Sequence, residues 1–296
     1  MTTILPRVSS LPTPVSAPGP ERSTFGAFFA LELRETATAR WFHVYLLAFA
    51  GLMGLFFAFG LAESQVMGFH GLGRLLLTFI QASIVILPLF VLVTTARTLV
   101  GDRESGVWEY MLALPVSFSG YYWGRFAGRS LAMTLPLVLA LLGGAGFEQL
   151  RGGEVPWGIV AYYAALVASL AVCFLGIAMG VSILSATQES ALGSAFGIWM
   201  LLEALIDALL LGALIRQQVR AEWVLGAALL NPIQAFRTAS VALFEPEMSV
   251  LGPLSYTLVD TLGRGGLLAW ALAWPTVVGL AAAAFGYRVF RRSDVV

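Results

Sequence analysis

The sequence predicts an all-α integral membrane protein with six transmembrane helices, because six long apolar stretches occur among its 296 residues. A helix needs about 20 mostly apolar residues to cross roughly 30 Å of hydrocarbon. Hydrophobic residues make up 58% of the chain and charged residues only 11%, whereas about a quarter of the residues in a soluble domain are charged. The stretches lie near 42–62, 75–99, 126–146, 158–184, 191–214 and 266–290.

The chain begins with a segment, residues 1–20, that holds five prolines among serines and threonines. Such a composition cannot bury enough apolar surface to order itself, so we expect a disordered cytoplasmic tail. Residues 21–296 should form one six-span domain with no second globular domain. The first apolar run begins only around Trp41, so no signal peptide is visible and the first span should remain in the protein.

A segment from about residue 23 to residue 40 precedes the first span and carries Phe25, Phe28, Phe29 and Leu33 near helical spacing. This pattern predicts an interfacial helix, with Phe28 in contact with lipid. The alternative is that the segment is a frayed extension of the first span.

The loop between the second and third spans predicts a short amphipathic helix on the cytoplasmic surface. Its apolar stripe follows the spacing i, i+3, i+4 and i+7, and a proline ends it. The stripe consists of Val107, Tyr110, Met111 and Leu114, the other faces carry Asp102, Ser105 and Glu109, and the terminating residue is Pro115. Either this helix seals the interface between two spans, or its acidic and aromatic outer face docks a cytoplasmic partner.

All seventeen basic residues are arginines, and their distribution predicts the orientation. Eleven fall on the side of the two termini and six on the other side, so the positive-inside rule places both termini in the cytoplasm. The first group is Arg7, Arg22, Arg34, Arg40, Arg97, Arg103, Arg125, Arg129, Arg288, Arg291 and Arg292, and the second is Arg74, Arg151, Arg216, Arg220, Arg237 and Arg264.

Two carboxylates, Glu203 and Asp207, lie four residues apart in the fifth span and therefore share one helix face. Each costs about 2.5–3.5 kcal/mol within a span, so something must compensate them. They line a water-filled route for a cationic group, or they pair structurally with Arg216 or Arg220 just beyond the span. We favour pairing, because Asp207 is near the outer end of the helix.

Residues 215–265 predict a helical outer loop between spans five and six. Asn231 before Pro232 fits a helix N-cap followed by proline at the first helical position. Helices are expected near 221–230 and 232–244, and they either pack over the membrane domain or bind an external partner.

Glycines recur at four-residue spacing in spans three, four and five, which permits close contact between helices. The positions are Gly120, Gly124, Gly128, Gly176, Gly180, Gly193 and Gly197. Packing within one chain is the default expectation for all of them.

Catalytic and metal sites are not predicted anywhere in this sequence. Cys173 is the only cysteine and most simply fills space inside the fourth span, and Met67 with His70 offers two metal ligands without a third. The phosphate-binding loop of ATPases is absent and the chain has no lysine to place in one, so we expect no ATP hydrolysis by this chain alone.

These features resemble the six-span permease subunits of type 2 ABC transporters over most of the chain. Glu32, Leu33, Arg40 and Trp41 match points of the family's interfacial helix, and the helix after span two matches at Glu104, Gly106, Glu109, Leu114, Pro115, Gly124 and Arg125. The chain departs from the family pattern in Arg125, where lysine is usual, in the additional carboxylate of Glu203, and in its longer N-terminal tail.

Within the family, the nearest resemblance is to the permeases that serve nitrous oxide reductase maturation. It rests on residues 229–232 followed by Phe236 and Arg237, on the spacing of Trp199 and Asp207, and on residues 290–292. This resemblance implies a periplasmic accessory protein docked on the 215–265 loop through Asn231, Pro232 and Arg237. The cargo would be a copper- or sulfur-related species, or the output would be mechanical work.

The resemblance also implies a homodimer in the bacterial inner membrane with a cytoplasmic ATPase dimer that supplies the ATP and Mg site. The 102–114 helix would couple to it through Asp102, Glu104, Trp108 and Glu109, with a second contact at Gln188 and Glu189. No nucleic-acid partner is expected. The alternatives are an ABC exporter of lipid, drug or peptide, a non-transporting membrane scaffold, and a secondary transporter, for which no internal repeat is found.

Overall fold

The computed structural model describes residues 22–67, 71–112, 116–153, 155–215, 221–244 and 254–292, and all regular structure within these ranges is helical. The elements follow in the order α1 (Arg22–Thr38), α2 (Arg40–Met67), α3 (Gly71–Thr95), α4 (Thr98–Glu104), α5 (Val107–Leu112), α6 (Phe118–Leu150), α7 (Trp157–Leu184), α8 (Gln188–Met200), the π-helix η1 (Leu201–Leu205), α9 (Ile206–Ile215), α10 (Ala221–Leu230), α11 (Pro232–Phe244) and α12 (Leu254–Arg292).

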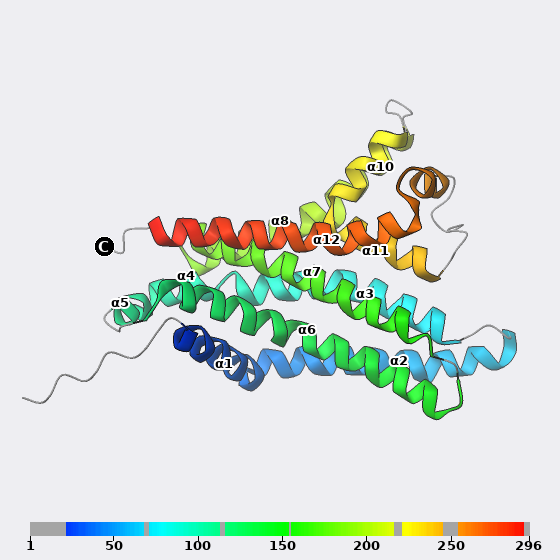
Figure 1. The fold of residues 1–296 in the computed structure, drawn as a ribbon, viewed down its shortest axis with the longest axis horizontal. Coiled ribbons are helices and arrows are strands. Elements are labelled where there is room, and N and C mark those ends of the chain that lie inside the picture. Colours follow the sequence, from blue (N-terminus) through cyan, green and yellow to red (C-terminus); the bar gives the residue numbers. More distant parts are fainter. Residues whose placement is uncertain are drawn as a thin grey trace, which may run out of the picture.

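The long helices run side by side as one elongated bundle, with α5 near one end and α11 toward the other (Figure 1). Five helices in the described part of the chain are long and apolar enough to cross a membrane: Ala82–Glu104, Phe118–Leu150, Trp157–Leu184, Gln188–Leu210 and Gly263–Arg292. They match the predicted spans two to six. Helix α2 is 28 residues long and occupies the place of the first predicted span. Many of its side chains lie outside the described residues, so the sixth crossing stays a prediction.

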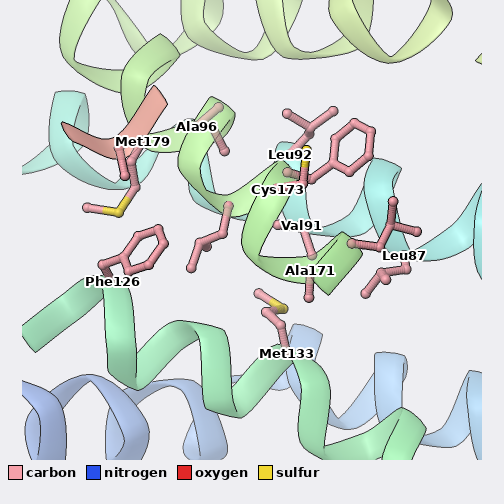
Figure 2. Close-up of a cluster of buried hydrophobic side chains, with 14 of the residues drawn as sticks. Leu87, Val91, Leu92, Ala96, Phe126, Met133, Ala171, Cys173 and Met179 are labelled. Atoms are coloured by element: carbon pink, nitrogen blue, oxygen red, sulfur yellow. The ribbon is translucent and has the colours of Figure 1, made fainter. Parts of the chain in front are cut away.

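Helix α7 is the centre of the bundle, because neighbours cover it on several sides. Figure 2 shows Ala171 and Cys173 of α7 between α3 residues such as Val91 and Leu92 and the α6 residue Met133. Against α12 the approach is closer still. A Cβ placed on Gly176 would lie 1.9 Å from the carbonyl oxygen of Gly279, so these two backbones touch where no side chain fits.

Helix α1 is separate from α2 and lies along the first half of α6 (Figure 1). The groove that receives it is made by glycines of α6: a Cβ on Gly124 would lie 2.8 Å from the Phe25 carbonyl oxygen and 2.9 Å from the Cβ of Phe28. Phe28 is only 7% exposed, and its ring meets that of Tyr121 edge-on at 5.1 Å. The prediction that Phe28 contacts lipid is therefore wrong, and Phe25 and Leu31 are exposed instead.

The helix predicted after span two is broken into α4 and α5. Gly106 lies between them with a φ of 74°, a left-handed conformation that glycine adopts without strain. This break changes which residues face inward: Tyr110 is 69% exposed, whereas Trp108 is 7% exposed. The predicted apolar stripe was wrong at Tyr110 for this reason. Leu114 and Pro115 lie outside the described residues.

The remaining glycine repeats divide into two groups. Gly120, Gly124 and Gly128 receive α1, and Gly176 and Gly180 receive α12, so the expectation of packing within the chain is met there. A Cβ on Gly193 or Gly197 of α8 would meet nothing within 4 Å. That face of α8 is open in the single chain.

Candidate functional site: two charged clusters and the α4–α5 surface

The first charged cluster, here called the Arg125 cluster, consists of Glu32, Asp102, Arg125 and Arg129. The Glu32 carboxylate lies 3.2 Å from Nε of Arg125 and 2.9 Å from Nε of Arg129. Asp102 pairs with Arg125 and accepts a hydrogen bond of 2.6 Å from the Tyr121 hydroxyl. Helices α1, α4 and α6 are thus joined through two guanidinium groups.

Burial makes the Arg125 cluster a strong constraint on these three helices. The side chain of Glu32 is 2% exposed and those of Arg125 and Arg129 are each 12% exposed. Removing one partner of a buried ion pair leaves an uncompensated charge, which is costly. A further carboxylate, Glu35, is 55% exposed and lies 3.9 Å from Arg125. Sequence reasoning missed the cluster because its members are spread over three elements, although Glu32 and Arg125 were each noted as family positions.

The predicted ATPase-coupling residues lie in two different environments. Asp102 and Trp108 face the bundle, Asp102 toward Arg125 and Trp108 toward the ring of Phe290, which is 5.1 Å away. Glu109 and Glu189 are exposed. The segment therefore has one side held by the bundle and another side open to a partner.

Glu104 and Gln188 were predicted at two separate contacts, and the structure brings them together. The Glu104 carboxylate accepts hydrogen bonds from the Gln188 backbone N–H at 3.2 Å and from its side-chain amide at 2.8 Å. Arg103 donates to the carbonyl oxygen of Ala186 at 3.0 Å, and its guanidinium lies 5.9 Å from the Trp108 ring centroid. Helix α4 and the turn between α7 and α8 consequently form one continuous surface.

The second charged cluster, here called the Arg237 cluster, consists of Glu203, Asp207, Gln234 and Arg237. Arg237 on α11 lies 2.8 Å from the Asp207 carboxylate and 3.2 Å from that of Glu203, and Gln234 donates to Asp207. The two carboxylates are structurally paired, as favoured from the sequence. Among the described residues their partner is Arg237. The predicted partners, Arg216 and Arg220, lie outside the described residues, so that pairing stays a prediction.

Glu203 lies in the π-helical turn η1, and Asn231 binds a backbone carbonyl of the same turn. Within η1 the hydrogen-bonding pattern widens from i→i+4 to i→i+5, which leaves backbone groups free for other partners. The Asn231 side chain donates to the Leu202 carbonyl oxygen at 2.6 Å and accepts from the Ile233 N–H at 3.0 Å. One amide thus caps α11, as the sequence predicted, and fastens it to η1.

The three residues predicted to dock an outer partner are all engaged within the chain. Asn231 and Pro232 are buried, and Arg237 points at the span-five carboxylates. Their placement argues against direct contact with another protein. They hold α11 in position; the side chain of Arg237 is 29% exposed, and docking of an outer partner through these residues stays a prediction.

Two tryptophans of α12 that the sequence analysis did not single out support the same region. The indole N–H of Trp270 donates to the Leu229 carbonyl oxygen at 3.0 Å, and that of Trp274 donates to the Leu230 carbonyl oxygen at 2.8 Å. Their rings stack at 5.1 Å. The last carbonyls of a helix lack partners within the helix, so these bonds fasten the end of α10 to α12.

A metal centre is not formed by the described residues, among which no group of three or more His, Cys, Asp or Glu side chains lies close enough to hold an ion. His70 lies outside the described ranges, as does the side chain of Met67. That pair stays an untested prediction.

Long apolar helices in one bundle, with a charged surface at one end held by buried ion pairs, define a multi-pass membrane protein. The family model for ABC-2 family transporter proteins matches residues 27–295, and the chain belongs to this family.

The chain is similar to two proteins named probable ABC transporter permease protein NosY. The one from Stutzerimonas stutzeri is 28% identical over 274 residues, which cover 88% of this chain and 95% of the relative. The one from Pseudomonas aeruginosa is 25% identical over 224 residues, which cover 72% of this chain and 80% of the relative. The chain is a NosY-like permease of the type 2 ABC class.

Proposed function

We propose that this chain is the membrane subunit of an ATP-driven transporter in the bacterial inner membrane, with both termini cytoplasmic. Two copies bind two separate ATPase subunits, which supply the ATP and Mg site. The observation that carries the proposal is the two-sided α4–α5 segment. Asp102 and Trp108 hold it to the bundle, while Glu109 and Tyr110 are exposed for an ATPase.

The open face of α8 supports the homodimer. An apolar groove between α3 and α8 is lined by Leu89, Phe90, Val93, Leu192, Gly193 and Phe196, with Glu189 at its end. Gly193 and Gly197 lie four residues apart, and a Cβ on either would meet nothing within 4 Å. Small residues at this spacing let two helices approach closely. A second copy of the chain fits this face.

The biological role that we propose is nitrous oxide reductase maturation, and it rests on the likeness to NosY. The permease would deliver a copper- or sulfur-related species or transmit mechanical work to a periplasmic accessory protein. That protein would dock on the loop that contains α10 and α11, whose frame is held by Asn231, Pro232 and Arg237. An exporter of lipid, drug or peptide is the second candidate, because it would share the α4–α5 surface and differ only in its outer partner.

The composition of the native complex tests these proposals. Gentle detergent extraction followed by intact mass spectrometry should find two copies of this chain, two ATPases and one periplasmic protein. Two ATPases alone would favour an exporter, and a complex without any ATPase would overturn the proposal and favour a scaffold.

Two substitutions test the proposed surfaces separately. Glu109→Arg should release the ATPase or abolish its stimulation, whereas Glu148→Arg, a matched charge reversal far from α5, should do neither. Gly193→Leu should weaken the dimer, and Gly143→Leu on α6, which also has free space around its Cα, should leave it intact. Normal binding and normal stimulation in Glu109→Arg would refute the assigned ATPase surface.

A further inference from the structure

Phe290 is an aromatic residue in the last turn of α12, and it is buried although Arg291 and Arg292 beside it are exposed. Its ring centroid lies 5.1 Å from that of Trp108, 5.9 Å from those of Phe118 and Tyr121, and 6.0 Å from that of Tyr122. These rings belong to α5 and to the beginning of α6. Phe290 therefore joins the end of span six to the α4–α5 surface.

Trp108 is the α5 side chain that reaches this cluster. Among the described residues of α5, Glu109 and Tyr110 are exposed, Val107 and Met111 are half-buried, and Trp108 alone is classed as buried. Edge-to-face ring pairs have a preferred geometry, so a tilt of α5 would disturb the Trp108–Phe290 contact. The end of α12 is thus placed to respond to a displacement of α5.

Between Phe290 and its other end, α12 packs closely against α7. Its backbone touches α7 at Gly279, where a Cβ would lie 2.4 Å from the Val172 carbonyl oxygen. Thr276 donates to Ser169 of α7 at 2.9 Å. About 20 residues, or roughly 30 Å of helix, separate Phe290 from Trp270, which holds the end of α10 together with Trp274.

We infer that Phe290 is a positioning residue that receives the movement of α5, and that α12 delivers this movement to the end of α10 through Trp270 and Trp274. The inference rests on the proposed function, since it requires an ATPase at the α4–α5 surface. It adds a route from that surface to the far end of the bundle through aromatic contacts and α12.

The test uses the complete complex of this chain with its ATPase in lipid nanodiscs. The reporter is the variant Leu230→Cys, because Leu230 is 56% exposed and its backbone carbonyl binds Trp274; the rate of its reaction with a maleimide is measured. That rate should differ between the nucleotide-free and the ATP–vanadate states. In Phe290→Leu and in Trp108→Leu the difference should disappear while the amount of bound ATPase stays unchanged. Phe290→Tyr, which retains the ring, should restore it.

Phe285→Leu is the matched control, because Phe285 lies on the same helix and is 53% exposed. It should leave the nucleotide-dependent difference intact. If both Phe290→Leu and Trp108→Leu keep the full nucleotide-dependent difference in labelling rate, the inference is overturned and the proposed function stands. The same holds if the parent complex binds ATPase but its labelling rate at position 230 does not depend on nucleotide. A parent chain that binds no ATPase would instead overturn the proposed function.

Discussion

The Arg125 and Arg237 clusters both pair arginine with two or more carboxylates, yet they differ in burial and in the number of helices that they join. The Arg125 cluster connects α1, α4 and α6, and Glu32 at its centre is 2% exposed. The Arg237 cluster connects α11 to the η1–α9 segment, and the side chains of Arg237 and Asp207 are 29% and 30% exposed. Breaking an enclosed ion pair leaves a buried charge without a partner, which costs more than breaking a partly exposed pair. We therefore expect the Arg125 cluster to hold its helices rigidly and to contribute more to stability than the Arg237 cluster.

The largest effect is expected for Glu32→Ala, which leaves two buried guanidiniums without their shared carboxylate. We expect the free energy of unfolding to fall by about 3–5 kcal/mol. The measurement is the yield of folded protein and its unfolding transition in detergent. Glu35→Ala is the control at the same site: this carboxylate is 55% exposed and lies 3.9 Å from Arg125, so the loss should be about 0–1 kcal/mol. Equal losses of stability in both variants would contradict the interpretation that buried pairing in the Arg125 cluster holds the three helices together.

A smaller effect is expected for Asp207→Asn, which removes one charged partner of Arg237 while Glu203 remains at 3.2 Å. Loss of a hydrogen bond to a charged group costs about 1.5–3 kcal/mol. Stability and assembly should both decrease, and proteolysis should reach the α11 region sooner. Unchanged assembly combined with lost transport would instead favour a water-lined route for a cationic group.

The amide of Asn231 allows its two hydrogen bonds to be separated. Asn231→Ala loses both and should cost about 0.5–2 kcal/mol, the range for a lost N-cap. Asn231→Asp keeps the cap on Ile233 but places an acceptor against the Leu202 carbonyl oxygen, which is 2.6 Å from the present donor. Unfolding transitions of the two variants should show whether the contact with η1 matters more than the cap. If Asn231→Asp matches the parent chain, the contact with η1 is dispensable.

The smallest effect is expected from salt. The Debye length falls from about 10 Å at 0.1 M to about 3 Å at 1 M, so high salt should weaken the more exposed cluster first. The stability difference between the parent chain and Asp207→Asn should shrink at 1 M salt, whereas the difference for Glu32→Ala should persist. Parallel shrinkage of both differences would erase the distinction between the two clusters.

The sequence predicts the helical class, the positions of the spans and the shared face of Glu203 and Asp207, because these depend on composition and local period. The sequence does not predict which residues pair when they are distant in the chain. Arg237 lies 30 residues from Asp207, and nothing local favours it over Arg216 or Arg220. The glycines of α6 could have predicted the position of α1. Gly120, Gly124 and Gly128 line one face of α6, and a second helix can pack closely there; α1 does so and buries Phe28.

The segment after span two shows how one residue changes a whole pattern. A continuous helix would put Tyr110 with Met111 on the apolar face, but the left-handed Gly106 restarts the helix and turns Trp108 inward. Glycine at that position was visible in the sequence. Its left-handed conformation was not, and neither were the contacts of the neighbouring α4, where Asp102 pairs with Arg125 and Glu104 with Gln188.

Cys173, the only thiol in the sequence, is fully buried between α3 and α6 (Figure 2). A thiol reagent can reach it only when α7 separates from its neighbours, so the rate of labelling of the unmodified chain measures the opening of the bundle core. The labelling rate of Cys173 therefore reports how often the protein unfolds locally, and mass spectrometry can measure it in native membranes without any substitution.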